Sequence, residues 1–326
     1  MDIQCSQQSK QRGNLRLNKP RQEFEQHFER HFEQHRSLLY GVAYRMLGSV
    51  ADTEDILQET YLRWHQSKDI KNTKAFLITV VTRLCIDQLK SARHQREEYI
   101  GSWLPEPLVK KLGHQKGSDE LLHLSETLSF AFMVLLEKLN PTERAVYILK
   151  QAFEFEYAEI SEVVNKTESH CRQLDHRARK HIANNRVRYE TDKQTHQRLY
   201  ANFMKAIGSG ETEELVKILA SESILYSDGG GKVKAALRPI FGADKIARFF
   251  IGIGKKFSGR ISAQPAILNG ALGIITFDQG EIQGAISFAI KQGKVQNIFY
   301  ISNPDKLKHI PSILDAAPKS ASDSAT

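Results

Sequence analysis

Apolar side chains recur at helical spacing through most of the first half of the chain, and this pattern predicts amphipathic helices. Phe24, Phe28 and Phe32 are four residues apart, and apolar positions continue this helical region until about Gly48. Two further helices, joined by a short polar loop, are predicted within residues 51–96. This pair forms a surface rather than a pocket.

The two helices of residues 51–96 differ in charge. The buried stripe of the first helix is predicted to be Ile56, Leu57, Thr60, Tyr61 and Trp64. The stripe of the second is predicted to be Phe76, Leu77, Val80, Val81, Leu84, Cys85 and Leu89. Acidic side chains dominate the other faces of the first helix, and basic ones accumulate along the second. The charge pattern alone fits an interaction surface and the solvated faces of an ordinary bundle about equally well.

Residues 124–188 are again helical and contain a second recognisable arrangement. Asn140 before Pro141 and Glu143 predicts a helix start with a capping box. A short helix from Tyr157 to Val164, a turn at 165–167 and a helix from Glu168 predict a helix-turn-helix, in which Asn165 takes the left-handed conformation.

The last of these helices is strongly basic. The segment 166–188 carries seven Lys or Arg side chains against Glu168 and Asp175, a net charge of +5. Such a charge on one element suits the neutralisation of DNA phosphates. Cys171, Leu174 and Ala178 are predicted to face inward, and Cys171 is interpreted as a core residue rather than a redox sensor.

Beyond residue 195 the pattern changes from helices to strands. Helices are predicted around Tyr200–Ile207, Glu211–Leu219 and Gly242–Lys256. Strands follow, several with period-two alternation, at Ile261–Leu268, Ala271–Asp278, Ile282–Lys291 and Val295–Ile301. Asn-Gly or Gln-Gly pairs separate them, which favours tight hairpin turns. The order predicts an α+β domain whose helices precede an antiparallel meander.

Composition narrows the possibilities further. A chain of 326 residues suits two or three domains, and its net charge of +8 favours an acidic partner only weakly, because the excess is spread along the chain. Cys5, Cys85 and Cys171 are far apart and form no metal motif, so no metal or other cofactor is predicted. The sequence contains no apolar run long enough to span a bilayer and no secretion signal, so we expect no membrane association and a cytoplasmic location.

The order of residues in DTEDILQETYLRWH, AFL and RLCIDQLK resembles region two of the bacterial extracytoplasmic-function (group IV) sigma factors. The segment YAEISEVVNKTESHCRQLDHRARK resembles sigma region four, although Asn165-Lys166-Thr167 replaces the usual Gly-x-Ser turn. The runs WLPEP, DGGGK and NPDKL resemble motifs of the subgroup that carries a fused C-terminal SnoaL-like domain.

The resemblance implies a multidomain protein. Its fold would consist of two all-α sigma domains, a helical bundle and then a helix-turn-helix, followed by an α+β SnoaL/NTF2-like cone with an antiparallel curved sheet. The expected boundaries are a flexible tail at 1–22, region two at 23–97, a linker at 98–123, region four at 124–188, the SnoaL-like domain at 195–310 and a flexible tail at 311–326.

The resemblance also implies partners and contact residues. The acidic helix would bind the clamp helices of core RNA polymerase through Asp52, Asp55, Gln58, Glu59 and Arg63, with the polymerase flap as a further contact. The loop 66–73 and the next helix would capture the minus-ten promoter element, with DNA contacts at Asn72, Thr79, Arg83 and Lys90. The minus-thirty-five element would be read by Ser169, His170, Arg172, Gln173, His176, Arg177 and Lys180. Regulatory contacts between domains are expected at Trp103, Pro105, Asp228, Gly229, Gly230, Asn303, Pro304 and Asp305. For Trp103, a local contact with the preceding helix and a regulatory latch are equally supported.

Three functions compete for this sequence: a sigma factor with a built-in regulatory domain, a cyclase- or isomerase-type enzyme fused to a DNA-binding regulator, and a plain repressor. The C-terminal domain offers Asp228, Asp278, Glu281 and Tyr226 without a recognisable acid/base constellation, and it has no histidine between His196 and His309. A repressor leaves the acidic helix without a role. We therefore predict a sigma factor controlled by its SnoaL-like domain, and the sequence leaves open whether side chains or a small-molecule ligand fill the cone.

Overall fold

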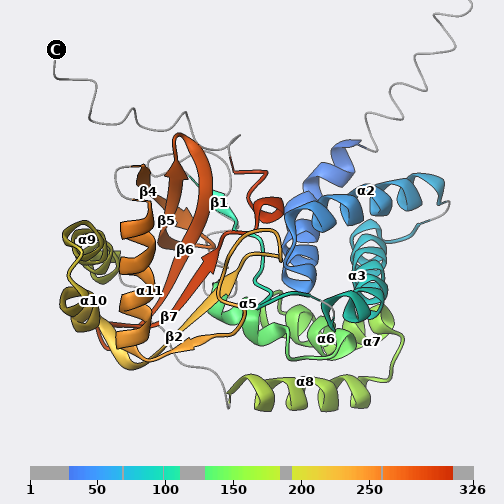
Figure 1. Cartoon of the computed structure of the whole chain (residues 1–326). Coiled ribbons are helices and arrows are strands. Elements are labelled where there is room, and N and C mark those ends of the chain that lie inside the picture. The colour runs from blue at the N-terminus through green and yellow to red at the C-terminus, as the bar shows by residue number, and fades with distance from the viewer. Residues whose placement is uncertain are drawn as a thin grey trace, which may run out of the picture.

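The computed structural model describes residues 29–67, 70–97, 99–110, 129–183, 193–257 and 260–310. Within these ranges the chain forms a helical lobe and a sheet lobe, which lie side by side with the linker running between them (Figure 1). The tails predicted at 1–22 and 311–326, and the linker residues 111–123, lie outside the described residues.

The helical lobe contains the helices predicted from the apolar spacing. They cover residues 29–47, then α2 (Val50–Gln66), α3 (Thr73–Glu97), α5 (Phe130–Leu136), α6 (Pro141–Gln151), α7 (Tyr157–Val164) and α8 (Glu168–Ala183). The predicted start of α6 is confirmed, because Asn140 and Glu143 form a reciprocal capping box. The predicted left-handed turn is confirmed too, with Asn165 at φ 52°.

One hydrophobic core joins the two predicted sigma domains. It runs from Leu39 in the first described helix through Ile78 and Ile86 of α3 to Cys171 of α8. The predicted stripe of α3 omitted Ile78 and Ile86, which are both buried. Because α3 packs against α2 on one side and against α6 and α7 on the other, its apolar surface is wider than that of a helix with one partner.

The sheet lobe begins with α9 (Lys193–Ser209) and α10 (Thr212–Ile218). The elements that follow are β2 (Leu219–Asp228), β3 (Ile240–Phe241), α11 (Ala243–Lys256), β4 (Ile261–Leu268), β5 (Ala271–Asp278), β6 (Glu281–Lys291), β7 (Lys294–Ile301) and the 3₁₀ turn η2 (Pro304–Lys306). The predicted antiparallel meander is confirmed for β4 to β7. Its turns have positive φ at Asn269, Gln279 and Gln292, each followed by glycine, as the hairpin pairs predicted.

The sheet also contains pairings that the sequence did not predict. In the order β1-β4-β5-β6-β7-β2-β3, strand β2 runs parallel to β7, with Leu225 opposite Ile298. The sheet is therefore mixed rather than wholly antiparallel. In addition, β1 (Val109–Lys110) comes from the predicted linker and pairs with β4. The linker is thus an edge strand of the C-terminal sheet.

The two faces of the sheet are covered by different parts of the chain. Helices α9, α10 and α11 cover one face, where Phe203, Phe250 and Phe288 pack together. The other face is covered by the linker and by α5, whose Phe130 stacks on Phe299 with ring centroids 6.0 Å apart. The far side of α5 faces the helical lobe through Leu136. Helix α5 therefore belongs to both cores.

Candidate nucleic-acid interface

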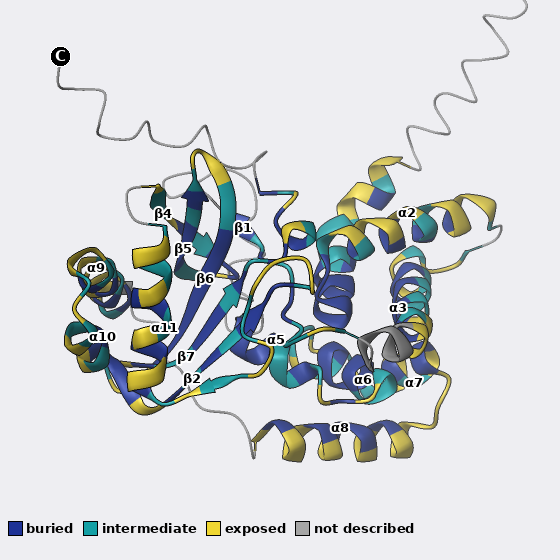
Figure 2. Ribbon diagram, viewed as in Figure 1, coloured by how far each residue is buried: buried dark blue, intermediate teal, exposed yellow. Residues whose placement is uncertain are grey.

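Helix α8 presents the residues that the sequence predicted for DNA reading. All seven are exposed: Ser169, His170, Arg172, Gln173, His176, Arg177 and Lys180. Five of them, Ser169, Arg172, Gln173, His176 and Arg177, lie together on one side of α8 and form one open surface. Figure 2 shows the outer side of α8 exposed and its inner side buried. A basic, exposed face on the second helix of a helix-turn-helix fits the major groove of DNA.

The inner side of α8 holds the helix against the lobe. Cys171, Leu174, Ala178 and Ile182 lie in the shared core, which confirms the inward positions predicted for the first three. Burial raises the pKa of the Cys171 thiol, and the charge of Glu168 adds to the effect. The thiol therefore stays protonated, as befits a core residue rather than a redox sensor.

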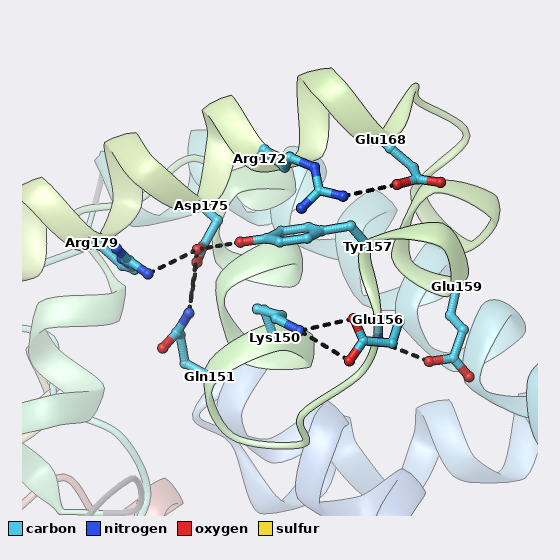
Figure 3. Close-up of polar contacts among 9 residues, drawn as sticks. All are labelled: Lys150, Gln151, Glu156, Tyr157, Glu159, Glu168, Arg172, Asp175 and Arg179. Carbon is cyan, nitrogen blue, oxygen red and sulfur yellow. Dashed lines mark hydrogen bonds and ion pairs between the residues drawn. The ribbon is translucent and has the colours of Figure 1, made fainter.

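A buried carboxylate, which the sequence analysis missed, fixes α8 relative to its neighbours. Asp175 is 1% exposed and accepts hydrogen bonds from the Tyr157 hydroxyl at 2.8 Å and from the Gln151 amide at 3.2 Å. The Arg179 guanidinium lies 3.7 Å away (Figure 3). The sequence did contain a signal for this buried carboxylate, because Asp175 follows Leu174 on the inward side of an otherwise basic helix.

The ring of Tyr157 also contacts two cations. Arg172 lies over the ring, 4.5 Å from its centroid, and Lys150 lies 5.0 Å from the centroid on the other side (Figure 3). Arg172 donates a hydrogen bond to Glu168 at 3.1 Å as well. The pKa of the Tyr157 hydroxyl is raised, chiefly by burial and then by its bond to Asp175. Arg172 is thus held at a fixed place near the start of α8.

Helix α2 presents the residues predicted to bind polymerase. Asp55, Gln58 and Arg63 are exposed, whereas Asp52 and Glu59 are partly buried. Glu59 pairs with Arg63 at 2.8 Å. The structure therefore leaves most of this face open for a partner.

The residues predicted to contact the minus-ten element lie along α3 and have local partners. Asn72 caps the helix by accepting from the Ala75 amide at 3.1 Å, and the Thr79 hydroxyl donates to the carbonyl of Ala75 at 2.8 Å. Lys90 pairs with Asp87 at 3.1 Å. Residues 68 and 69 of the predicted capture loop lie outside the described residues.

Arg83 links the two sigma domains. Its guanidinium donates to the carbonyls of Val163 and Glu162, both at 2.8 Å, at the C-terminal end of α7. These carbonyls carry the negative end of the helix dipole, so a cation suits this position. In this arrangement Arg83 contacts region four, and its predicted DNA contact would require that link to break.

The predicted interdomain residues meet around Asp228, which is fully buried. Its carboxylate accepts from the Tyr99 hydroxyl at 2.5 Å, from the Leu104 amide at 2.8 Å and from Lys306 Nζ at 2.7 Å. Burial raises the pKa of Tyr99, and the bond to Asp228 raises it further. Because Tyr99 and Leu104 belong to the linker, this buried ion pair joins the linker to the sheet lobe.

The two other motifs surround the same point. Asn303 donates to the Tyr99 hydroxyl at 3.0 Å, and its backbone amide donates to the carbonyl of Asp228. Gly230 has φ 59° and approaches the Asn303 side chain so closely that a Cβ atom would clash with it, while a Cβ atom on Gly229 would lie 2.7 Å from a backbone carbonyl. Asp305, next to Pro304 in η2, binds Lys232 and Lys308, and these bonds lower its pKa to about 2.

Trp103 makes contacts on both sides of the interface. Its ring packs on Gly48 together with Pro105, and Lys306 Nζ lies 4.3 Å from its ring centroid. Both contacts are with segments far from Trp103 in the chain, and the choice between a local contact with the preceding helix and a regulatory latch stays a prediction. Within the described ranges, no group of three or more side chains suited to a metal ion occurs, and no helix is long and apolar enough to cross a membrane.

Comparison with known proteins identifies the family. Residues 31–95 match the family model for Sigma-70 region 2, and residues 129–182 match that for Sigma-70 region 4. The chain is 37% identical over 289 residues to the ECF RNA polymerase sigma factor SigJ of Mycobacterium tuberculosis, covering 85% of this chain and 92% of that protein. The chain belongs to the ECF RNA polymerase sigma factors.

Other relatives agree with this assignment. The probable ECF sigma factor SigI of the same species is 28% identical over 279 residues, covering 83% of this chain and 92% of that protein. The crystal structure of Mycobacterium tuberculosis SigJ matches with a TM-score of 0.71 at 34% identity, covering 85% of this chain and 97% of that one. This ECF sigma factor therefore acts in promoter-specific transcription initiation, with core RNA polymerase and promoter DNA as its partners. These relatives do not favour the enzyme alternative.

Proposed function

We propose that the exposed face of α2 binds the clamp helices of core polymerase and that region four contacts the flap. The loop 66–73 with α3 captures the minus-ten element, and α8 reads the minus-thirty-five element. The exposed, basic face of α8 and the open, acidic face of α2 support this division. Each surface lies on a helix whose opposite side is fixed in the shared core.

The docking face is tested by Asp55→Arg, which reverses an exposed charge at its centre. We expect affinity for core polymerase to fall at least about tenfold. The new arginine would face partner charges that complement Asp55 and would repel them, which costs more than about 1.4 kcal/mol. Glu213→Arg makes the same charge change at an exposed position of α10 and serves as the control. Unchanged pull-down of core polymerase by Asp55→Arg would rule out this face.

The two reading surfaces must separate before both promoter elements are bound. Elements centred about 25 base pairs apart lie about 85 Å apart along B-form DNA. Helices α3 and α8 both pack on α7, so they lie within about two helix diameters, roughly 20–24 Å. If α3 and α8 bind these two elements, as proposed, this packing is a closed state and transcription requires an open one.

We also propose that the C-terminal domain regulates this opening by contact rather than by catalysis. The linker is a strand of its sheet, and α5 is shared between its core and that of the helical lobe. Of the acid/base candidates, Asp228 is occupied by the linker and by Lys306, and Asp278 is paired with Arg260. Both carboxylates therefore make structural contacts rather than serving as an acid or a base.

A small-molecule ligand in the cone stays a prediction. On the helix-covered face of the sheet, the hydroxyls of Ser223 and Ser227 are buried without a hydrogen-bond partner. They are the polar groups that a ligand entering this apolar face would meet.

Deletion of residues 195–326 tests the regulatory role. We expect promoter-dependent transcription by the reconstituted polymerase to change severalfold, and deletion of residues 303–326 alone to change it differently, because only η2 and the groups around it are then lost. Equal transcription by the full chain and both truncated chains would contradict regulation by this domain.

A further inference from the structure

The chain turns sharply between the N-terminal helix and α2, and the linker covers this corner. Gly48 has φ 68°, and a Cβ atom there would lie 2.7 Å from the ring of Trp103. The amide of Glu106 donates to the carbonyl of Gly48 at 2.8 Å. The linker is therefore in contact with the backbone from which the polymerase-binding helix begins.

The side chain of Glu106 acts as a cap on α2. Its carboxylate accepts from the Val50 amide at 2.7 Å and from the Ser49 hydroxyl at 2.9 Å. Ser49 in turn accepts from the amide of Asp52 at 3.2 Å. A carboxylate at this position accepts a hydrogen bond from an amide that has no partner within the helix, and its charge interacts favourably with the positive end of the helix dipole. The first turn of α2 thus depends on a residue more than fifty positions later in the chain.

The same linker segment is fixed to the C-terminal sheet by Asn269, in the turn between β4 and β5. Asn269 is 1% exposed, and its carbonyl oxygen accepts from the Leu108 amide at 2.9 Å. Its amide nitrogen donates to the Tyr44 hydroxyl at 2.7 Å. That hydroxyl donates to the carbonyl of Glu106 at 2.7 Å. Tyr44 is fully buried and lies just before the corner between the N-terminal helix and α2. One chain of hydrogen bonds therefore joins the sheet to this corner.

From this geometry we propose that Glu106 is a positioning residue for the polymerase-binding helix. Asn269 and Tyr44 connect it to the C-terminal sheet, so docking of that domain fixes the start and direction of α2. The C-terminal domain would thereby regulate binding to core polymerase without touching the docking face of α2. This inference rests on the proposed docking role of α2 and specifies how regulation reaches it.

Hydrogen–deuterium exchange of residues 48–57 in the full chain tests the proposal. In Glu106→Ala we expect the amides of Val50 and Asp52 to exchange roughly fivefold faster, the size expected for the loss of a helix cap. Asn269→Ala should accelerate exchange of the same amides, although the substituted residue lies in the distant sheet. Affinity for core polymerase should fall by a similar factor in both variants, because the competent orientation of α2 is less populated.

The matched control is Gln279→Ala, at the other end of β5. Gln279 has φ 52° against 50° for Asn269, so alanine meets the same backbone strain, but Gln279 is exposed. We expect no change at residues 48–57 in this variant. If Asn269→Ala unfolds the chain, Tyr44→Phe replaces it, because it keeps the buried ring and removes only the shared hydroxyl.

The outcomes separate this inference from the docking proposal. Unchanged exchange at residues 48–57 in Asn269→Ala, or in Tyr44→Phe where it is used, would overturn the link to the sheet, even if Asp55→Arg abolishes polymerase binding. Faster exchange with unaltered polymerase affinity would overturn the positioning role. If Asp55→Arg has no effect, the docking face is wrong, and the exchange measurement still decides whether the sheet fixes α2.

Discussion

At the scale of single residues, one buried carboxylate connects α8 to its neighbouring helices. Asp175 receives bonds from α6 and α7, so its loss leaves the Tyr157 hydroxyl and the Gln151 amide without their acceptor. We expect Asp175→Ala to lower the free energy of unfolding by about 1–3 kcal/mol, measured by urea denaturation. Asp87→Ala, which removes an exposed partner of Lys90, should cost less than about 0.5 kcal/mol. Equal losses in the two variants would contradict the assigned role.

Two neighbouring residues on α8 should differ in what they read. Arg172 is held by the Tyr157 ring and by Glu168, so it suits a fixed phosphate contact. Gln173 is exposed on the same face of α8, which suits a base contact. We expect Arg172→Ala to weaken binding to all promoters alike, and Gln173→Ala to lose about 1–3 kcal/mol of discrimination against mismatched promoters. Quantitative footprinting on matched and mismatched sites measures both; unaltered binding in both variants would exclude this face of α8.

At the scale of elements, α3 connects the two sigma domains, and we expect its contacts to favour the closed state. It packs on α2, α6 and α7, and Arg83 caps the end of α7. Hydrogen bonds from a charged donor contribute about 1.5–3 kcal/mol. We expect Arg83→Ala to shift the balance toward the open state by at least about tenfold, seen as a larger radius of gyration in solution scattering. Lys90→Ala removes a cation from the same helix without breaking a contact with α7 and should leave the radius unchanged. The same radius in both variants would show that Arg83 does not hold the domains together.

At the scale of the whole molecule, the linker and α5 contribute buried side chains to a hydrophobic core of the sheet lobe. Leu104 and Val109 of the linker and Phe130 of α5 are all buried against the sheet. The protein without residues 195–326 therefore exposes these side chains. We expect it to bind a hydrophobic dye such as ANS more strongly than the full chain, and Leu104→Ser in that truncated protein to reduce the binding. Dye binding equal to that of the full chain would mean that the linker and α5 find another partner.

The sequence by itself determined the local features whose causes lie within a few residues. Helical spacing predicted the stripes of α2 and α8, and Asn140 predicted a capping box, because the donors and acceptors lie within one turn. Asn165 and Asn269 occupy the positive-φ positions that short turns require. The exposed positions of α8 followed from the same periodicity.

Only the tertiary structure decided which distant groups meet. The pairing of β2 with β7, the addition of the linker strand β1 to the sheet and the wide apolar surface of α3 depend on partners far along the chain. From the sequence, Asp175 was recognised only as an acidic residue in a basic helix, and Glu106 only as part of a linker. Both are caps or acceptors for donors on other elements, and no periodic pattern encodes such contacts because each joins residues whose separation is set by the fold.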